Sequence, residues 1–396
     1  MRARSRPIGP ALLLVAAAVV VGGGTYLAVQ PGGTEVETTV IQDGLAWPWD
    51  LAFTPDGRMF VTERPGRVRL YASADPGADL LATLEIPNVR AEIESGTMGI
   101  AVDVDFDAHP YAYVCTSVDA DGPDGGGRWV NQLLRLRIGA DGALSLDGIL
   151  FGDHDPDPTE LMRAAIHHNG CAVEMDRSRH LWLTMGDANT GSGANLAQDV
   201  ASMNGKVLRL NADGSIPDDN PVLPGAAVPT AAWSMGHRNP QGIVVTTDGA
   251  VYEVEHGTNV DDELNRIVPG GNYGYGCVSG TGNDGPATTL CNGGTAYLDP
   301  LWASGSPTLA TSGVAMLPEA WGDWAGNLVV TTLKEGDLRH FRLGADGQSA
   351  ELMETLLDGA YGRLRAAVIG PDGALYLTTS NDSQDDVVIR VAPPAA

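Results

Sequence analysis

From about residue 44 onward, hydrophobic residues occur in short runs that Gly, Pro, Asn and Asp interrupt. Almost no stretch shows the 3.6-residue period of an amphipathic helix, so the pattern predicts an all-β chain. One unit recurs along it, a turn followed by an apolar run that ends in Thr or a carboxylate residue. Six copies of this unit begin near residues 56, 108, 178, 248, 327 and 372.

Three copies carry Asp-Gly at the turn, at Asp56-Gly57, Asp248-Gly249 and Asp372-Gly373. Asp-Gly between two apolar runs favours a β-hairpin, because glycine tolerates a positive φ and the aspartate side chain caps the turn. Six units in about 360 residues leave roughly 60 residues for each, which suffices for a four-stranded blade with long loops. The predicted fold is a six-bladed β-propeller with four-stranded antiparallel blades, since a β-sandwich would give fewer and less regular copies.

The N-terminal segment differs from the rest of the chain. Arg2, Arg4 and Arg6 precede an uncharged apolar run of 22 residues over 8–29. Such a segment is typical of an export signal, and it is also long enough to anchor the chain in a membrane. We therefore expect an exported, extracytoplasmic protein, either secreted or anchored at the outer face of a membrane. The expected organisation is a signal peptide or anchor over 1–30, a linker over 31–43, the propeller over 44–392 and a tail over 393–396.

The charge balance argues against two classes of partner. Lys and Arg number 24 against 50 Asp and Glu, which gives a net charge of −26. Nucleic acids bind to basic faces and anionic lipid surfaces attract basic segments, so neither is an expected partner of the propeller.

Four cysteines in an exported chain are more typical of disulfides than of free thiols. Cys277 and Cys291 would close a short loop rich in Gly, Asn and Thr, which a disulfide would staple. Cys115 and Cys171 both lie in strand-like segments, and whether they pair is left open. The sequence contains no CxxC or HExxH motif, so a zinc site is not expected.

Four sets of segments are too rich in polar residues and glycine to be simple turns. Each falls at the edge of a repeat unit, where propeller loops converge on the central channel. These sets are 166–170 with 184–187, 233–242, 255–265 with 270–274, and 334–336 with 363–365.

Three runs of sequence carry a resemblance to a known family: 205–210 with 213–217, 236–242, and 262–265 with 272–274. From about residue 44 to 391 the chain resembles the soluble sugar dehydrogenases that depend on pyrroloquinoline quinone (PQQ), which include soluble glucose dehydrogenase and the aldose sugar dehydrogenases. The resemblance implies the same six-bladed propeller. It also implies oxidation of the C1 hydroxyl of an aldose sugar to the lactone by hydride transfer to PQQ, which an external quinone or cytochrome would reoxidise.

Specific roles follow from the same resemblance. His168 matches the general base that takes the proton of the C1 hydroxyl, a task that suits an imidazole near neutral pH. Arg238 and Asn239 match residues that hydrogen-bond the quinone oxygens, where a guanidinium would stabilise developing charge. Asp187 is assigned to orienting or charge-balancing the loop of the base. The remaining expected contacts to the cofactor are Glu94, Thr308, Lys334, Arg363 and Arg365.

The resemblance also implies two calcium ions. The carbonyls of Gly257 and Thr258 match those that hold an ion next to the cofactor, and Glu263 with the carbonyl of Tyr273 matches a second, structural ion. Oxygen-rich loops suit calcium, which takes 6–8 oxygen ligands. The neighbouring pair of aspartates at 261–262 is equally consistent with a solvated turn.

The chain departs from the family's pattern at three places. Cys171-Ala172 stands where Gly-Arg is usual, Glu94 stands where the family has Gln, and Ser306 lies near the position of an aromatic residue. These departures bear on substrate preference and cofactor affinity more than on the fold. A non-catalytic calcium-containing propeller that binds a carbohydrate or protein partner on the same face is kept as the alternative, with a lactonase-type calcium propeller as a weaker third. The joint presence of His168 and the expected cationic residues favours the enzyme.

Overall fold

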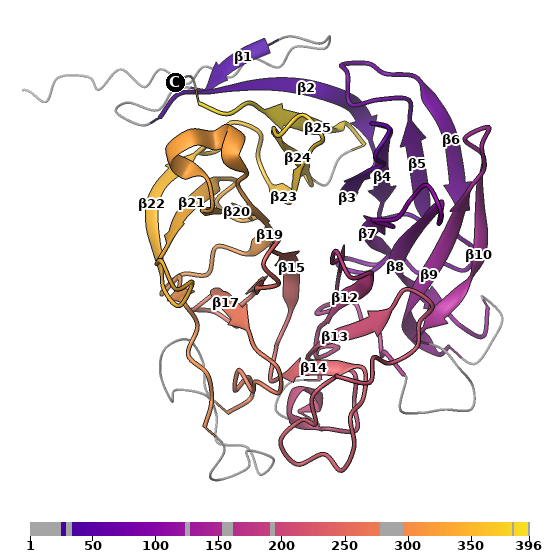
Figure 1. Ribbon diagram of the computed structural model, residues 1–396, viewed down its shortest axis with the longest axis vertical. Helices are drawn as coiled ribbons and strands as arrows, with labels where there is room; N and C mark the ends of the chain where they lie inside the picture. The colour runs from indigo at the N-terminus through magenta and orange to yellow at the C-terminus, as the bar shows by residue number, and fades with distance from the viewer. Residues whose placement is uncertain are drawn as a thin grey trace, which may run out of the picture.

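The computed structural model describes residues 25–28, 34–122, 127–152, 161–190, 195–277, 296–381 and 384–394. The strands of this part of the chain form six antiparallel sheets arranged in a ring (Figure 1), so the predicted six-bladed β-propeller is confirmed. Five sheets have four strands, and the sixth has a fifth strand at its outer edge.

In blades 1 to 5 the four strands follow one another along the chain, and the first of them lies innermost in the ring. Blade 1 contains β3 (Pro48–Phe53), β4 (Met59–Glu63), β5 (Arg67–Tyr71) and β6 (Leu80–Glu85). Blade 2 contains β7 (Thr97–Val102), β8 (Tyr111–Asp119), β9 (Trp129–Ile138) and β10 (Leu144–Phe151). Blade 3 contains β11 (Gly170–Met175), β12 (His180–Met185), β13 (Lys206–Asn211) and β14 (Ala232–Met235), with the short 3-10 helix η2 (Leu196–Gln198) between β12 and β13.

The second half of the ring follows the same order. Blade 4 contains β15 (Pro240–Val245), β16 (Val251–Glu255), β17 (Glu263–Ile267) and β18 (Trp302–Ala303). Blade 5 contains β19 (Thr311–Met316), β20 (Leu328–Thr332), β21 (Leu338–Leu343) and β22 (Ala350–Leu356), with the 3-10 helix η3 (Glu319–Trp324) between β19 and β20. Blade 6 contains β23 (Leu364–Ile369), β24 (Leu375–Thr379) and β25 (Asp386–Val391), completed by β2 (Val36–Leu45) and β1 (Thr25–Ala28).

Blade 6 closes the ring with strands from both ends of the chain. The indigo strand β2 pairs antiparallel with the yellow strand β25 (Figure 1). The expected linker over 31–43 is therefore wrong for residues 36–43, which belong to β2. Val36 and Thr38 are buried while Glu37 is exposed, the alternation of a strand with one buried face. The segment 1–30 lies outside the described residues apart from β1, and no helix in the described part is long and apolar enough to cross a membrane.

All six repeat units of the sequence fall on the connection between the first and second strands of a blade. At the three Asp-Gly turns the glycine has the positive φ that the turn requires, with values of 89° at Gly57, 86° at Gly249 and 76° at Gly373. Apolar side chains of neighbouring blades form shared core clusters, one of which contains Tyr113 and Leu133 of blade 2 and Val173 of blade 3.

A second repeated feature links each blade to the next. In blade 1, the hydroxyl of Thr62 on the second strand accepts the backbone N–H of Asp50 at 3.0 Å and donates to the carbonyl of Met98 in blade 2 at 2.6 Å. Thr184, Thr331 and Thr378 occupy the same register position in blades 3, 5 and 6, one residue beyond a pair with the innermost strand. They donate to the carbonyls of Pro240, Arg365 and Trp49 in the following blade.

The interfaces between blades 2 and 3 and between blades 4 and 5 have no threonine at this register position. In blade 2 the register position is Cys115, which forms a disulfide with Cys171 of blade 3. In blade 4 it is Val254, and there Thr311 of blade 5 donates to the carbonyl of Glu255 at 3.1 Å. The disulfide resolves the pairing left open by the sequence. Cys277 is also disulfide-bonded, and its expected partner Cys291 lies outside the described residues.

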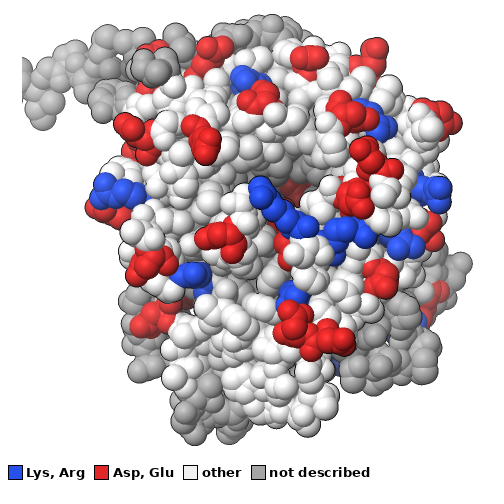
Figure 2. Space-filling view, viewed as in Figure 1, with Lys and Arg blue, Asp and Glu red and all other residues white. Residues whose placement is uncertain are grey.

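The innermost strands surround an axial channel of about 780 Å³. Figure 2 shows a hollow at the centre of the ring, with basic side chains beside it and acidic side chains spread over the surrounding face. Asp50 and Glu174 lie inside this channel. Burial raises the pKa of Asp50 to about 7, and burial together with the nearby Asp50 raises the pKa of Glu174 to about 8.

We expect Thr62→Val to destabilise the fold, because it leaves two buried backbone groups without their hydroxyl partner. The free energy of unfolding should fall by about 1–3 kcal/mol, measured by urea denaturation. Thr83→Val, the same change on the exposed outer strand β6, is the matched control and should change it little. Equal effects of the two substitutions would contradict the role assigned to Thr62.

Glu174→Gln should change the pH dependence of stability. A carboxyl group whose pKa is raised in the folded state favours folding only while protonated, so its stabilisation is lost as the pH rises through the folded pKa of about 8. The Tm of the variant should therefore exceed that of the wild type at pH 8.5, and the difference should shrink towards pH 5. Glu85→Gln on exposed β6 is the control, and a constant difference across this range would refute the prediction.

Candidate active site

A cavity of about 350 Å³ lies at the end of the ring where the innermost strands begin. The segments that precede β7, β11, β15 and β19, together with the segment that follows β16, supply its walls. Most of its side chains are polar or ionisable. The lining residues are Glu94, His167, His168, Arg238, His256, Gly257, Thr258, Asp262, Thr308 and Ala310.

His168 and Asp187 form a hydrogen-bonded pair in the wall of this cavity. The Nδ1 atom of His168 lies 2.6 Å from Oδ1 of Asp187, a carboxylate that is 1% exposed. The backbone N–H of Asn189 also donates to this oxygen, at 3.0 Å, and fixes its position. An ionised carboxylate only accepts hydrogen bonds, so in a neutral imidazole this contact would make Nδ1 the donor and leave Nε2 as the proton acceptor.

The backbone around His168 is held in an uncommon conformation. His168, Gly170 and Cys171 have φ values of 60°, 64° and 71°, in the left-handed region that favours glycine. Three hydrogen bonds oppose relaxation: the N–H of His168 donates to Glu94 at 2.9 Å, its carbonyl accepts from Ala188 at 3.1 Å, and Gly170 donates to Asn239 at 3.2 Å.

The residue that follows β12, Gly186, also has to be glycine. A Cβ atom at Gly186 would lie 2.1 Å from the carbonyl oxygen of His168. The loop that carries the imidazole therefore packs directly against the backbone of the loop that carries Asp187.

Glu94 connects the loops of three blades. Its Oε2 atom accepts hydrogen bonds from the N–H of His168 at 2.9 Å and from the amide of Asn239 at 3.1 Å. Burial alone would raise the pKa of Glu94, but His256, the N–H of His168 and the two imidazoles at 167–168 outweigh it and lower the pKa below its ordinary value. Glu94 is therefore a carboxylate at neutral pH.

For His256 the effect of burial on the pKa prevails over that of the neighbouring carboxylates. Burial and the positive charges of Arg238 and Arg365 outweigh the attraction of Glu94 and Asp262, so the pKa of His256 lies below its ordinary value.

The four expected cationic residues do not all reach the cavity. Arg238 lines it and donates to the carbonyl of His256 at 3.1 Å. Lys334 borders it, because its ammonium group donates to the carbonyl of Thr308 at 3.0 Å. Arg363 is not among the residues that line it.

Arg365 lies below the cavity, among the residues that line the axial channel. Its guanidinium stacks 3.6 Å above the centre of the Trp49 ring and donates to Gln241 at 3.3 Å. Gln241 donates in turn to Asn239 at 3.0 Å, and Asn239 donates to Glu94. Trp49 and Gln241, neither of which was an expected site residue, thus join Arg365 to the cavity wall.

Asp262 is a clamp for two loops rather than part of a solvated turn. Its carboxylate is fully buried and accepts the backbone N–H of Gly257 at 2.8 Å, of Leu309 at 2.5 Å and of Ala310 at 2.6 Å. It therefore fixes the segment of Gly257 and Thr258 against the segment of Thr308. A buried carboxylate needs such donors, because an unpaired charge in the interior is costly.

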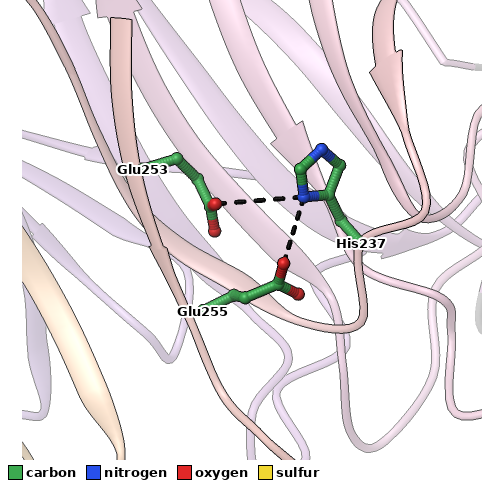
Figure 3. A group of neighbouring side chains, drawn as sticks. All are labelled: His237, Glu253 and Glu255. Carbon is green, nitrogen blue, oxygen red and sulfur yellow. Dashed lines mark hydrogen bonds and ion pairs between the residues drawn. The ribbon is translucent and has the colours of Figure 1, made fainter. Parts of the chain in front are cut away.

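A buried group of carboxylates lies beside this loop. Figure 3 shows Glu253 and Glu255 directed at one ring nitrogen of His237, with Nδ1–O distances of 3.9 and 3.1 Å. The amide of Asn265 lies 3.2–3.3 Å from both carboxylates and 3.2 Å from Glu263. Burial, and then the charge of Glu255, raise the pKa of Glu253 above its ordinary value.

Two oxygen atoms of this group have no hydrogen-bond donor among the described residues, Oε1 of Glu253 and Oδ1 of Asn265. The ring of Tyr273 stacks on His237 with a centroid separation of 4.7 Å, which brings the expected ligand Tyr273 to the same region as Glu263. The oxygen atoms gathered here are ligands that calcium prefers.

Comparison with known proteins identifies sugar dehydrogenases as relatives of this chain. The model of the glucose/sorbosone dehydrogenase family matches residues 45–390. The chain is 29% identical to the aldose sugar dehydrogenase YliI of Escherichia coli K12 over 369 residues, covering 90% of this chain and 93% of that protein. It is 30% identical to quinoprotein glucose dehydrogenase B of Acinetobacter calcoaceticus over 272 residues, covering 62% of this chain and 53% of that protein. The PQQ-bound aldose sugar dehydrogenase of Streptomyces coelicolor superposes with a TM-score of 0.70 at 25% identity, covering 95% of this chain and 99% of that structure.

Asp262→Asn should destabilise the protein, because the amide retains one acceptor atom where the carboxylate serves three backbone donors. We expect the free energy of unfolding to fall by about 1.5–3 kcal/mol in a denaturant titration. Asp261→Asn is the control, since Asp261 has a φ of 59° that asparagine tolerates and is less buried than Asp262. If the two substitutions cost the same, Asp262 is not the clamp described here.

Proposed function

Because the chain belongs to the glucose/sorbosone dehydrogenase family, we propose that it oxidises the C1 hydroxyl of an aldose sugar to the lactone with PQQ as cofactor. The observation that carries the proposal is the His168–Asp187 pair in the wall of a cavity that also contains Arg238. The disulfide between Cys115 and Cys171 supports an exported location, since such bonds persist in oxidising compartments.

The residues around the cavity suit an anionic quinone. PQQ carries carboxylate groups, and the Nε atoms of Arg238 and Arg363 are buried without an acceptor among the described residues. Arg238, Glu94 and Thr308 would hold the cofactor from the cavity wall and Lys334 from its border, and Asn239 would act from behind Glu94. Arg363 and Arg365, which flank the first residue of β23, would add positive charge near the cavity. When bound, PQQ supplies a quinone carbonyl group that accepts a hydride.

The proposed reaction needs a base for one proton, and we assign that role to His168. Its Nε2 takes the proton of the C1 hydroxyl while the hydride leaves the same carbon atom. Asp187 holds the ring in the required tautomer and stabilises the imidazolium that forms. Arg238 stabilises negative charge that develops beside it, which a preformed guanidinium does without reorganisation.

Calcium is the second proposed cofactor. The carbonyls of Gly257 and Thr258 would hold one ion next to the quinone, in a loop that Asp262 already fixes. Glu263 and the carbonyl of Tyr273 would hold the second ion, and the unpaired oxygens of Glu253 and Asn265 in the same region support a cation there. The sugar is the substrate, and an external quinone or cytochrome would accept the electrons.

The test loads the purified protein with calcium and PQQ and follows reduction of a dye on addition of an aldose. His168→Ala should lower kcat by about 10²–10⁴, the usual contribution of general base catalysis, while PQQ binding, measured by absorbance titration, stays within threefold of the wild type. His109→Ala, far from the cavity on the β7–β8 connection, is the matched control and should retain full activity.

Two results would contradict this proposal. Unchanged turnover in His168→Ala would remove the assigned base. A wild-type protein that binds calcium and PQQ but transfers no electrons from any aldose would favour the non-catalytic carbohydrate-binding propeller instead.

A further inference from the structure

We propose that the Cys115–Cys171 disulfide is a positioning device for the catalytic base, because it holds the backbone of β11 in the left-handed conformation on which the placement of His168 depends. This inference rests on the proposed role of His168. Three features carry it: the register position of Cys115, the conformation of Cys171, and the short distance along the chain from Cys171 to His168.

The register position shows that the disulfide replaces a hydrogen bond. In blades 1, 3, 5 and 6 the residue at this position is threonine, and each donates to a carbonyl of the next innermost strand. Cys115 occupies the position in blade 2, one residue beyond the pair Val114–Ile100. Its partner Cys171 is the second residue of β11, as Met98 is the second residue of β7 and Arg365 of β23. A covalent bond therefore stands at the one interface where the next blade carries the base.

The conformation of Cys171 explains why that interface requires a stronger link. Its φ of 71° is one that a residue with a Cβ atom adopts only when its surroundings impose it. The positive φ of His168 two positions before Gly170 adds a second constraint in the same segment. If Cys171 were free to relax to a negative φ, the peptide planes between it and His168 would rotate.

The disulfide is buried in the packed interface between blades 2 and 3, so its role is structural. Both cysteines are 0% exposed, so soluble reductants do not reach the sulfur atoms. The innermost strand of blade 2 also approaches closely, since a Cβ atom at Gly99 would lie 2.4 Å from the carbonyl oxygen of Cys171. The disulfide thus holds a segment that is already packed against blade 2.

The segment between the disulfide and the base is short and anchored at both ends. Only Asn169 and Gly170 separate His168 from Cys171, and Asn169 is fully buried, with its side-chain amide donating to the carbonyl of Ala165 at 2.7 Å. Glu94 holds the N–H of His168 at the other end. A shift at residue 171 is therefore transmitted to the imidazole and to its 2.6 Å contact with Asp187.

The test compares two double variants that differ by one methyl group. Cys115→Thr with Cys171→Gly removes the disulfide, introduces the threonine of the other blades and places at 171 a residue for which a positive φ is permitted. Cys115→Thr with Cys171→Ala removes the same disulfide but keeps a Cβ atom at 171. Both variants should have a lower Tm than the wild type, because both lose the covalent link.

The two variants should differ in catalysis. We expect the glycine variant to retain kcat within about threefold of the wild type, and the alanine variant to lose at least tenfold in kcat with the apparent KM for sugar changed less than threefold, since small misplacements of a catalytic group are costly. An alanine variant that does not fold, beside an active glycine variant, would also support the proposal. Equal kcat values in the two folded variants would overturn it.

Two further measurements separate this inference from its premise. Thr378→Val removes the equivalent link between blades 6 and 1, where the segment before the innermost strand β3 does not line the cavity, and should lower Tm without changing kcat. Hydrogen exchange of the amides over 168–172 should be faster in the alanine variant than in the glycine variant. That difference is expected even if the wild type oxidises no aldose, in which case only the proposed function fails, and its absence would refute the positioning role.

Discussion

A buried bond from the second strand of each blade to the innermost strand of the next holds the ring together. The backbone groups that it joins lie at irregularities in the pairing of the first two strands, where the regular ladder leaves N–H and C=O groups without partners. A threonine hydroxyl satisfies one of each, because it accepts and donates at the same time. Five interfaces use this register position and the sixth uses the carbonyl of the next residue. Every innermost strand therefore begins at a defined height, and so do the loops that precede it.

The cavity depends on this arrangement, because most of its walls are those preceding loops. Acidic residues then fix the loops against one another. Glu94 accepts the N–H of His168, Glu255 accepts the N–H of Arg238 at 2.6 Å, and Asp262 accepts three backbone donors. These carboxylates hold the loops in place, and Glu94 also lines the cavity. The groups that can act on a ligand are therefore Glu94, the imidazole of His168, the cationic side chains and the backbone carbonyls.

The fold could be predicted from the sequence because its signals are local. The Asp-Gly turns and the apolar runs after them each report on a few neighbouring residues, and all six fell on the same connection. The segment 36–43 was misassigned because its partner, β25, lies at the other end of the chain. The site shows the same division: His168, Arg238 and Glu94 line one cavity as expected, whereas the clamp role of Asp262 and the position of Arg365 below the cavity depend on contacts between blades. The disulfide pairing could not be derived either, since it depends on adjacent blades sharing a register.

The charge of the protein places a final constraint on the proposed chemistry. An anionic quinone must enter a chain with a net charge of −26, and Glu94 stands in the cavity as a carboxylate. Arg238 and Lys334 supply two positive charges at the cavity and its border, while Arg365 acts from beneath it. These charges are partly balanced by the carboxylates that clamp the loops. A divalent cation on the carbonyls of Gly257 and Thr258 would restore a positive potential without a further buried side chain, which is why the proposed function requires calcium and PQQ together.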